Sequence, residues 1–337
     1  MSLTDCSTAT AELDSDCRSA TALPIAQRFI LAIDLPMRHA GQRRVFLRVE
    51  VVGSPQSPAV WVAGGISAGQ HVLRNALDVS EGWWQSLADQ RGALDPGRYR
   101  LLACDWVGAE GDIDAPIDTA DQADAIALAL DALGIARLHA FVGASYGGMV
   151  GLQFAARHAA RLKRLVVLSA ADRPNPFASA FRALQRQVVA LGQLQCADEL
   201  GLALARQLAM LSYRTPEEFA ERFAGPVALE HGRARCSAEE YLQVCGQRYV
   251  QRWNSTAFLR LSESIDLHQI NPGDVAVPTT LFAVEQDWLA PAEQICALRD
   301  ALPNAAGCEV IASKYGHDAF LKEPARVDAV LTRAFES

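Results

Sequence analysis

Short apolar runs that alternate with helix-forming stretches constrain the fold of this chain more than any other sequence feature. From the third run onward, predicted helices at 80–90, 119–133, 147–160, 292–302 and 324–335 separate the runs. Such alternation requires crossover connections, which predict an α/β fold with an eight-stranded, mostly parallel sheet and helices on both faces. The eight runs, bounded by turn residues, are 29–34, 43–52, 59–63, 99–104, 138–142, 164–169, 279–284 and 308–312.

No strand-like run occurs between residues 173 and 270. This stretch instead predicts helices at 177–191, 197–211, 216–223, 238–251 and 255–265. An all-helical insertion inside one crossover is expected to cover the carboxyl ends of the strands, where open α/β sheets place their sites. We therefore predict a core of residues 23–172 and 271–337 and a helical lid of residues 173–270.

Two further expectations concern local structure. Residues 1–22 carry several acids and no apolar stretch, so they fit neither a secretory signal nor a transit peptide and predict a disordered polar tail. In the helix at 119–133, Thr119 and Gln122 have the spacing of a capping box, and Gly134 supplies a left-handed stop.

Composition excludes several classes of partner. The 337 residues include 31 Lys and Arg against 39 Asp and Glu, a net charge of −8, without a basic block that could follow a phosphate backbone. Nucleic acid and membranes are therefore poor partners, and no apolar stretch reaches the roughly 18–20 residues of a bilayer span. The eight cysteines have no metal-binding spacing, so we expect buried, reduced thiols in a cytoplasmic protein that holds no metal.

The run Gly143-Ala144-Ser145-Tyr146-Gly147 follows an apolar strand and opens an Ala-rich helix. This is the context of a Gly-x-Ser-x-Gly nucleophile elbow, in which small residues allow a sharp turn that exposes the serine hydroxyl. The helix that follows points its first N–H groups at any oxyanion that forms. The alternative is a glycine-rich turn with an inert serine.

A serine hydroxyl needs a base, and the base needs an acid that orients it. His317 follows the last predicted strand, and Asp287 follows the strand before it. The order Ser145, Asp287, His317 is that of α/β-hydrolases and differs from the orders of trypsin-like and subtilisin-like enzymes. Taken singly, Asp287 could be an acidic turn residue and His317 a surface or capping imidazole.

The oxyanion hole of such a site uses two backbone N–H groups. Tyr146, directly after the serine, supplies the first. Ile66, in the glycine-rich loop after the third strand, is the expected second donor, although a bend without a catalytic task is the alternative. His71 ends the same loop and could line the mouth of the site or cap the following helix, and the sequence does not separate these two possibilities.

With these motifs in place, the chain resembles the homoserine acyltransferase branch of the α/β-hydrolase superfamily, whose members acylate the homoserine side-chain hydroxyl in methionine biosynthesis. The resemblance runs from about residue 28 to the C-terminus. Beyond the serine motif it is carried by Leu-Ser-Tyr-Arg-Thr at 211–215, by Tyr-Gly-His-Asp-Ala-Phe-Leu at 315–321, and by shorter matches at 241–242, 252–253 and 258–261.

The resemblance implies a role for each site residue. Ser145 would be acylated by an acyl-CoA and would pass the acyl group to homoserine, with His317 as base and Asp287 as its orienter. Arg214 would hold the carboxylate of the amino acid and Asp318 its ammonium group, a pairing that suits a zwitterion. The alternatives are a lid salt bridge for Arg214 and a capping carboxylate for Asp318.

The resemblance also implies partners. Acyl-CoA is a substrate, with acetyl-CoA favoured and succinyl-CoA possible, and no cofactor is needed because the covalent step uses only the serine. Its members often pair through the lid helices, so a homodimer is possible. Three stretches depart from the family pattern, at 64–68, 107–116 and 252–258, and they bear on the identities of acyl group and acceptor.

Two alternatives to an acyltransferase stay open on the sequence. A serine esterase would use the same three residues with water as the acceptor. A binding protein on a hydrolase scaffold would use none of them.

Overall fold

All eight predicted strands are present and form one sheet in the computed structural model, which describes residues 23–89 and 92–336. The order across the sheet is β1-β2-β4-β3-β5-β6-β9-β10; β1 runs antiparallel to β2 and β2 to β4, and the other neighbours are parallel. The predicted α/β fold class is therefore confirmed. The strands are β1 (Ala26–Met37), β2 (Gly41–Val52), β3 (Ala59–Ala63), β4 (Arg100–Cys104), β5 (Ala140–Ala144), β6 (Leu165–Leu168), β9 (Thr279–Val284) and β10 (Ala305–Ile311).

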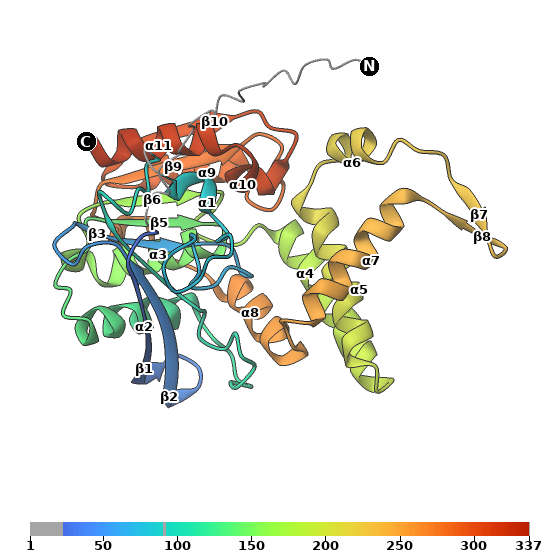
Figure 1. Cartoon of the computed structure of the whole chain (residues 1–337), viewed down its shortest axis with the longest axis horizontal. Helices are drawn as coiled ribbons and strands as arrows, with labels where there is room; N and C mark the ends of the chain where they lie inside the picture. The colour runs from blue at the N-terminus through green and yellow to red at the C-terminus, as the bar shows by residue number, and fades with distance from the viewer. Residues whose placement is uncertain (1–22, 90–91, 337) are drawn as a thin grey trace, which may run out of the picture.

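Helices cover both faces of this sheet (Figure 1). Helices α2 (Thr119–Ala132), α3 (Tyr146–Arg157) and α9 (Ala292–Ala301) contribute to a large hydrophobic cluster on one face, and α1 (Gln85–Ala88) and α11 (Pro324–Glu336) to a second cluster on the other. Strands β5 and β6 are buried along their whole length, which explains why they read as continuous apolar runs. Short helical turns complete the core: η1 (Ala159–Arg161), η2 (Pro272–Asp274), η3 (Gly316–Asp318) and α10 (Ala319–Lys322).

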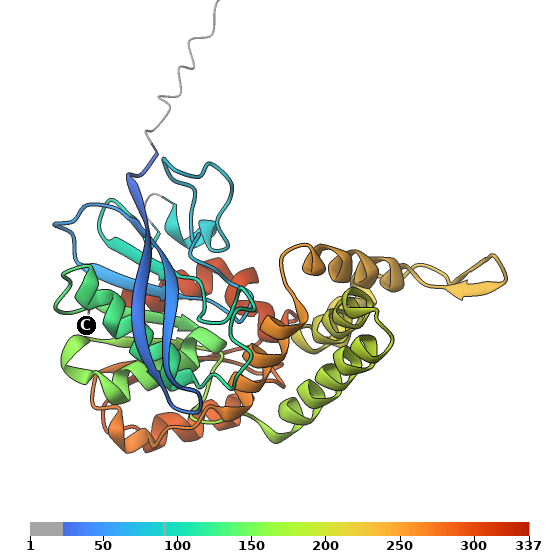
Figure 2. The same ribbon diagram turned by 90° about the horizontal axis from the view of Figure 1, so that it is seen from below.

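Five helices between β6 and β9 lie to one side of the sheet in both views (Figures 1 and 2). They are α4 (Pro176–Leu194), α5 (Asp198–Tyr213), α6 (Pro216–Arg222), α7 (Ser237–Val250) and α8 (Ser255–Leu267). Leu261 of α8 belongs to the large core cluster, so this helix joins the others to the sheet. The division into a core and a lid stays a prediction.

We expected an all-helical insertion, but the structure also contains two short strands in it. A hairpin of β7 (Ala228–Glu230) and β8 (Arg233–Arg235) separates α6 from α7 and projects away from the body (Figure 2). His231 and Gly232 form its turn with φ values of 49° and 77°. Both strands are fully exposed, so they carry none of the apolar alternation by which a strand is predicted from sequence.

Two helix starts differ from the prediction. Asp118, not Thr119, is the N-cap of α2 and forms the capping box with Asp121, while the Thr119 hydroxyl lies 2.8 Å from Nδ1 of His268. The predicted stop is present, with Gly134 at φ 66°. In the stretch predicted as a helix at 80–90, helix forms only over α1, because the backbone around residues 82–84 packs against residues 71–72.

The prediction of buried cysteines is only partly correct. Cys104 is buried, but Cys196 and Cys236 are exposed, and the six described cysteines form no disulfide. Within the described residues, none of the helices is both long and apolar enough for a membrane span. The predicted polar tail of residues 1–22 lies outside the described part of the chain.

Candidate active site

Ser145 stands at a sharp turn between β5 and α3, with φ 53° and ψ −119°. A Cβ atom at Gly143 would come within 2.2 Å of the Gly147 carbonyl oxygen, and one at Gly147 within 2.2 Å of the Ala63 carbonyl oxygen. Only glycine fits these two positions, which is the physical reason for the spacing seen in the sequence. The turn points the Ser145 hydroxyl at the carboxyl ends of the strands.

The three residues that the sequence singled out as nucleophile, base and acid form one chain of hydrogen bonds. Nε2 of His317 lies 2.7 Å from Oγ of Ser145, and its Nδ1 lies 2.7 Å from Oδ2 of Asp287. The other Asp287 oxygen accepts backbone N–H bonds from Leu289 and Ala290 at 2.9 and 3.1 Å. Asp287 and His317 are both buried. This is the geometry of a Ser-His-Asp triad.

Electrostatics at His317 favour a basic imidazole. Burial of the ring lowers its pKa, but the negative charge and hydrogen bond of Asp287 outweigh burial, so the pKa of His317 lies above its ordinary value. Asp318, the next residue, raises this pKa further. The base is therefore tuned to accept a proton.

Two backbone N–H groups beside Ser145 are available as oxyanion donors. Within the described residues, neither the Ile66 nor the Tyr146 N–H group has a hydrogen-bond acceptor. The loop that carries Ile66 is held against the elbow, because the Gly147 N–H donates to the Gly64 carbonyl at 2.9 Å and the Trp106 indole N–H donates to the Gly65 carbonyl at 3.2 Å. The structure thus brings both predicted donors to the nucleophile.

Arg214 and Asp318, for which the resemblance implies substrate-binding roles, lie close together. Nε of Arg214 is 3.4 Å from Oδ2 of Asp318, and both residues line a cavity of about 480 Å³ that also contains Ser145 and His317. Burial raises the pKa of Asp318, against the opposing positive charge of Arg214. A cation and an anion thus stand side by side next to the nucleophile.

Sequence reasoning missed several charged residues near the serine. Glu218 is buried and forms an ion pair with Nη1 of Arg214. Arg182 and Arg206 line a second, smaller cavity of about 70 Å³ that also reaches Ser145. Helical spacing could not have found these residues from Arg214, because Arg214 and Thr215 are extended and separate α5 from α6.

The described residues contain no group of three or more His, Cys, Asp or Glu side chains arranged to hold a metal ion. The carboxylates nearest Ser145 already have partners within the protein: Asp287 pairs with His317, and Asp318 contacts Arg214.

Comparison with known proteins places this fold and site in a class. Residues 71–324 match the family model described as the alpha/beta hydrolase fold. Among solved structures, homoserine O-acetyltransferase from Bacillus anthracis aligns over 94% of this chain and 98% of its own with a TM-score of 0.82 at 18% identity. Esterase E22 aligns over 92% and 100% with a TM-score of 0.81 at 15% identity. The fold and the serine site define an α/β-hydrolase.

Relatives in sequence narrow the class. A homoserine O-succinyltransferase of Xanthomonas campestris pv. campestris is 58% identical over 99% of this chain and 89% of its own length. A homoserine O-acetyltransferase of Thermus thermophilus is 33% identical over 74% and 71%. The chain belongs to the homoserine O-acyltransferase family of α/β-hydrolases.

The raised pKa of His317 gives a testable pH dependence. Only a neutral ring can take the serine proton, so the rate at which a fluorophosphonate labels Ser145 should rise with pH through the pKa of His317, with a midpoint above the ordinary histidine value of 6.5. Asp287→Asn should lower that midpoint and slow labelling. A midpoint that is unchanged in Asp287→Asn would contradict the assignment of Asp287.

Proposed function

We propose that this protein is an O-acyltransferase that moves an acyl group from acyl-CoA, through an acyl-serine at Ser145, to the side-chain hydroxyl of L-homoserine. The observation that carries the proposal is the combination of a hydrogen-bonded Ser145, His317 and Asp287 with Arg214 and Asp318 in the same cavity. Membership of the homoserine O-acyltransferase family supports the same activity.

The first half of the reaction acylates the serine. His317 takes the proton of the Ser145 hydroxyl as its oxygen attacks the thioester carbonyl, and the N–H groups of Ile66 and Tyr146 bind the oxyanion of the tetrahedral intermediate. The intermediate collapses, the C–S bond breaks, and His317 returns the proton to the departing thiolate. The products of this half are free CoA and acyl-Ser145.

The second half repeats these steps with a different nucleophile. His317 takes the proton of the homoserine hydroxyl, whose oxygen attacks the acyl-serine carbonyl, and the same two N–H groups bind the oxyanion. The intermediate then releases the Ser145 oxygen, which His317 reprotonates. No cofactor or metal takes part in this sequence, and acyl-CoA is consumed as a substrate.

Acceptor recognition rests on the pair of opposite charges beside the serine. The guanidinium of Arg214 suits the α-carboxylate of homoserine, and the carboxylate of Asp318 suits its ammonium group. Glu218 forms an ion pair with Nη1 of Arg214 and so holds the guanidinium in place. A neutral alcohol or water makes neither ionic contact, which favours the amino acid as acceptor.

The small cavity next to Ser145 favours succinyl-CoA as the donor. Arg182 and Arg186 share one carboxylate, that of Asp266, and the Arg206 guanidinium lies over the rings of Tyr213 and Tyr249. Among the described residues no acid forms an ion pair with Arg206, so this cavity has more positive than negative charge. The free carboxylate of a succinyl group would balance it, whereas an acetyl group has no charge to offer.

The relative that is 58% identical also supports succinyl-CoA as the donor, because that protein is a homoserine O-succinyltransferase. The sequence alone had favoured acetyl-CoA, with succinyl-CoA as a possibility.

We also infer a homodimer formed through the lid helices, in the cytoplasm where acyl-CoA is made. Large apolar side chains on α4 and α5 support the dimer because they face solvent in the single chain. These side chains are Leu184, Leu191, Leu194, Leu200 and Leu204.

Release of free thiol from acyl-CoA tests the proposed reaction. With succinyl-CoA as donor, we expect thiol release that depends on added L-homoserine, and much slower release with acetyl-CoA. Ser145→Ala should abolish turnover. Cleavage of an aryl ester at a rate unaffected by homoserine, without thiol release from either donor, would contradict acyl transfer and favour the esterase. Absence of both activities would favour a binding protein.

Removal of one positive charge from the small cavity beside Ser145 should change the preference between succinyl-CoA and acetyl-CoA. Loss of one charged hydrogen bond to the succinyl carboxylate is worth about 1.5–3 kcal/mol, so Arg182→Gln should lower kcat/KM for succinyl-CoA about 10- to 100-fold.

The same variant should change kcat/KM for acetyl-CoA less than about threefold, because acetyl lacks the carboxylate. Arg260→Gln is the matched control, since Arg260 also lies in the insertion but pairs with Asp114 and Glu263 outside the cavity. Equal losses with both donors would show that Arg182 has no role in donor choice.

A further inference from the structure

We propose that His71 is a positioning residue for the oxyanion hole: its ring, held between Glu50 and Ser80, fixes the loop that presents the Ile66 N–H group to the reacting carbonyl. This inference rests on the oxyanion role assigned to Ile66 in the proposed function. His71 touches neither Ser145 nor the cavities that contain Ser145, so it acts through the loop.

The segment from residue 64 to residue 84 has no helix or strand, so turns and contacts with neighbouring segments determine its shape. At its start, the bonds to Gly64 and Gly65 described above hold it to the elbow. At its far end, the indole N–H of Trp83 donates to the Gly69 carbonyl at 3.0 Å, and the Gln70 N–H donates to Asp105 at 2.8 Å. His71 is the next residue and provides the link to the sheet.

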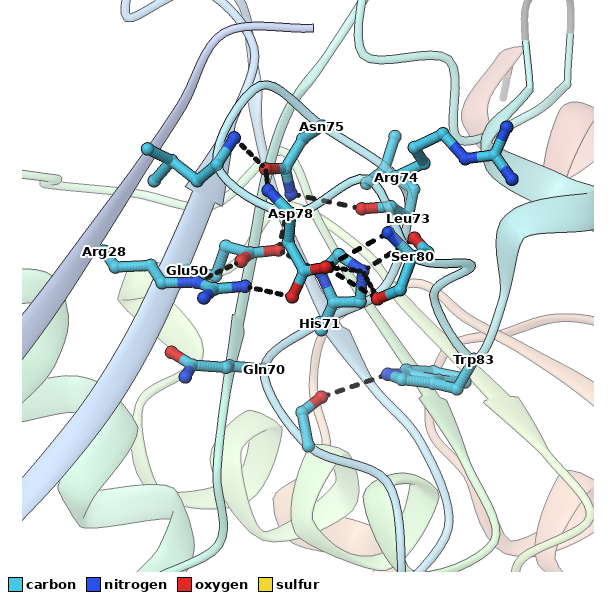
Figure 3. Close-up of polar contacts among 12 residues, drawn as sticks. Arg28, Glu50, Gln70, His71, Leu73, Arg74, Asn75, Asp78, Ser80 and Trp83 are labelled. Atoms are coloured by element: carbon cyan, nitrogen blue, oxygen red, sulfur yellow. Dashed lines mark hydrogen bonds and ion pairs between the residues drawn. The ribbon is translucent and has the colours of Figure 1, made fainter. Parts of the chain in front are cut away.

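That link is a buried carboxylate on β2 (Figure 3). Glu50 is 1% exposed and accepts three hydrogen bonds: from Nδ1 of His71 at 3.0 Å, from the Asn75 amide at 2.9 Å and from Nε of Arg28 at 2.7 Å. Two of these donors, His71 and Asn75, belong to the loop. A carboxylate without these partners would carry a large desolvation cost in this position, which makes the arrangement specific.

The His71 ring bridges two parts of the structure. Nδ1 lies 3.0 Å from a carboxylate oxygen of Glu50, and Nε2 lies 3.1 Å from the Ser80 carbonyl oxygen and 3.4 Å from the Ser80 hydroxyl. One ring therefore joins strand β2 to the far end of the loop.

A second carboxylate completes the cluster around His71. Asp78 lies 3.9 Å from Nε2 of His71 and 2.9 Å from the Arg28 guanidinium. Hydrogen bonds from the Ser80 hydroxyl and from Arg28 hold the pKa of Asp78 well below its ordinary value, so it is ionised. Arg28 therefore ties the loop residue Asp78 to Glu50 on β2, alongside His71.

Asparagine at position 71 tests the proposal, because it keeps one donor but cannot bridge both acceptors. In His71→Asn we expect kcat to fall about 10-fold, since a donor displaced by a fraction of an ångström binds the oxyanion less well. The KM values for donor and acceptor should stay within about twofold. Fluorophosphonate labelling of Ser145, whose adduct also uses the oxyanion hole, should slow by the same factor as kcat.

His39→Asn is the matched control, because His39 is also paired with a carboxylate, that of Asp118, but lies away from the loop. It should leave kcat and the labelling rate unchanged. Glu50→Gln provides a second variant that keeps the size of the side chain, and it should reproduce the kinetic pattern of His71→Asn.

Labelling at the wild-type rate in His71→Asn would overturn the proposal. Labelling does not need homoserine or acyl-CoA, so a protein that labels normally but transfers no acyl group would refute the proposed function while this inference could still hold.

Discussion

The backbone turn at Ser145 is the constraint on which the rest of the site depends. A non-glycine residue in this left-handed region costs about 1–3 kcal/mol, and it persists only where the surroundings enforce it. Here the enforcement comes from glycines at 143 and 147, which let α3 approach β3 and β5 closely. The turn places the hydroxyl within hydrogen-bond distance of His317, and the Tyr146 N–H group that follows it has no acceptor among the described residues.

The charged pair beside the nucleophile consists of one cation and one anion. The acceptor is a zwitterion, and Arg214 and Asp318 offer one charge of each sign beside the nucleophile. The net charge of −8 disfavours a polyanionic partner such as nucleic acid, yet Arg182 and Arg206 both line the small cavity beside Ser145, where we propose that an acyl carboxylate lies. The positions of the cations, rather than the net charge of the chain, determine which anion the protein can bind.

Much of this was predictable because it depends on local sequence. The elbow, the eight strands and the residues at the ends of β9 and β10 follow from periodicity and glycine spacing, and the structure brings Ser145, Asp287 and His317 together. The exposed hairpin at 228–235 has no apolar pattern and was missed. Contacts between distant segments, such as Arg182 with Asp266 or Glu50 with His71, leave no periodic signal in one sequence, so only the fold reveals them.

The central claim is that the acyl group rests on Ser145 between the two halves of the reaction. Mass spectrometry of the intact protein, mixed with succinyl-CoA in the absence of homoserine and quenched in acid, tests it most directly. The account predicts one added succinyl group per chain, located on the peptide that contains Ser145 and lost when homoserine is added before the quench. An unmodified protein that still forms O-succinylhomoserine would contradict it, because transfer would then proceed directly from the thioester.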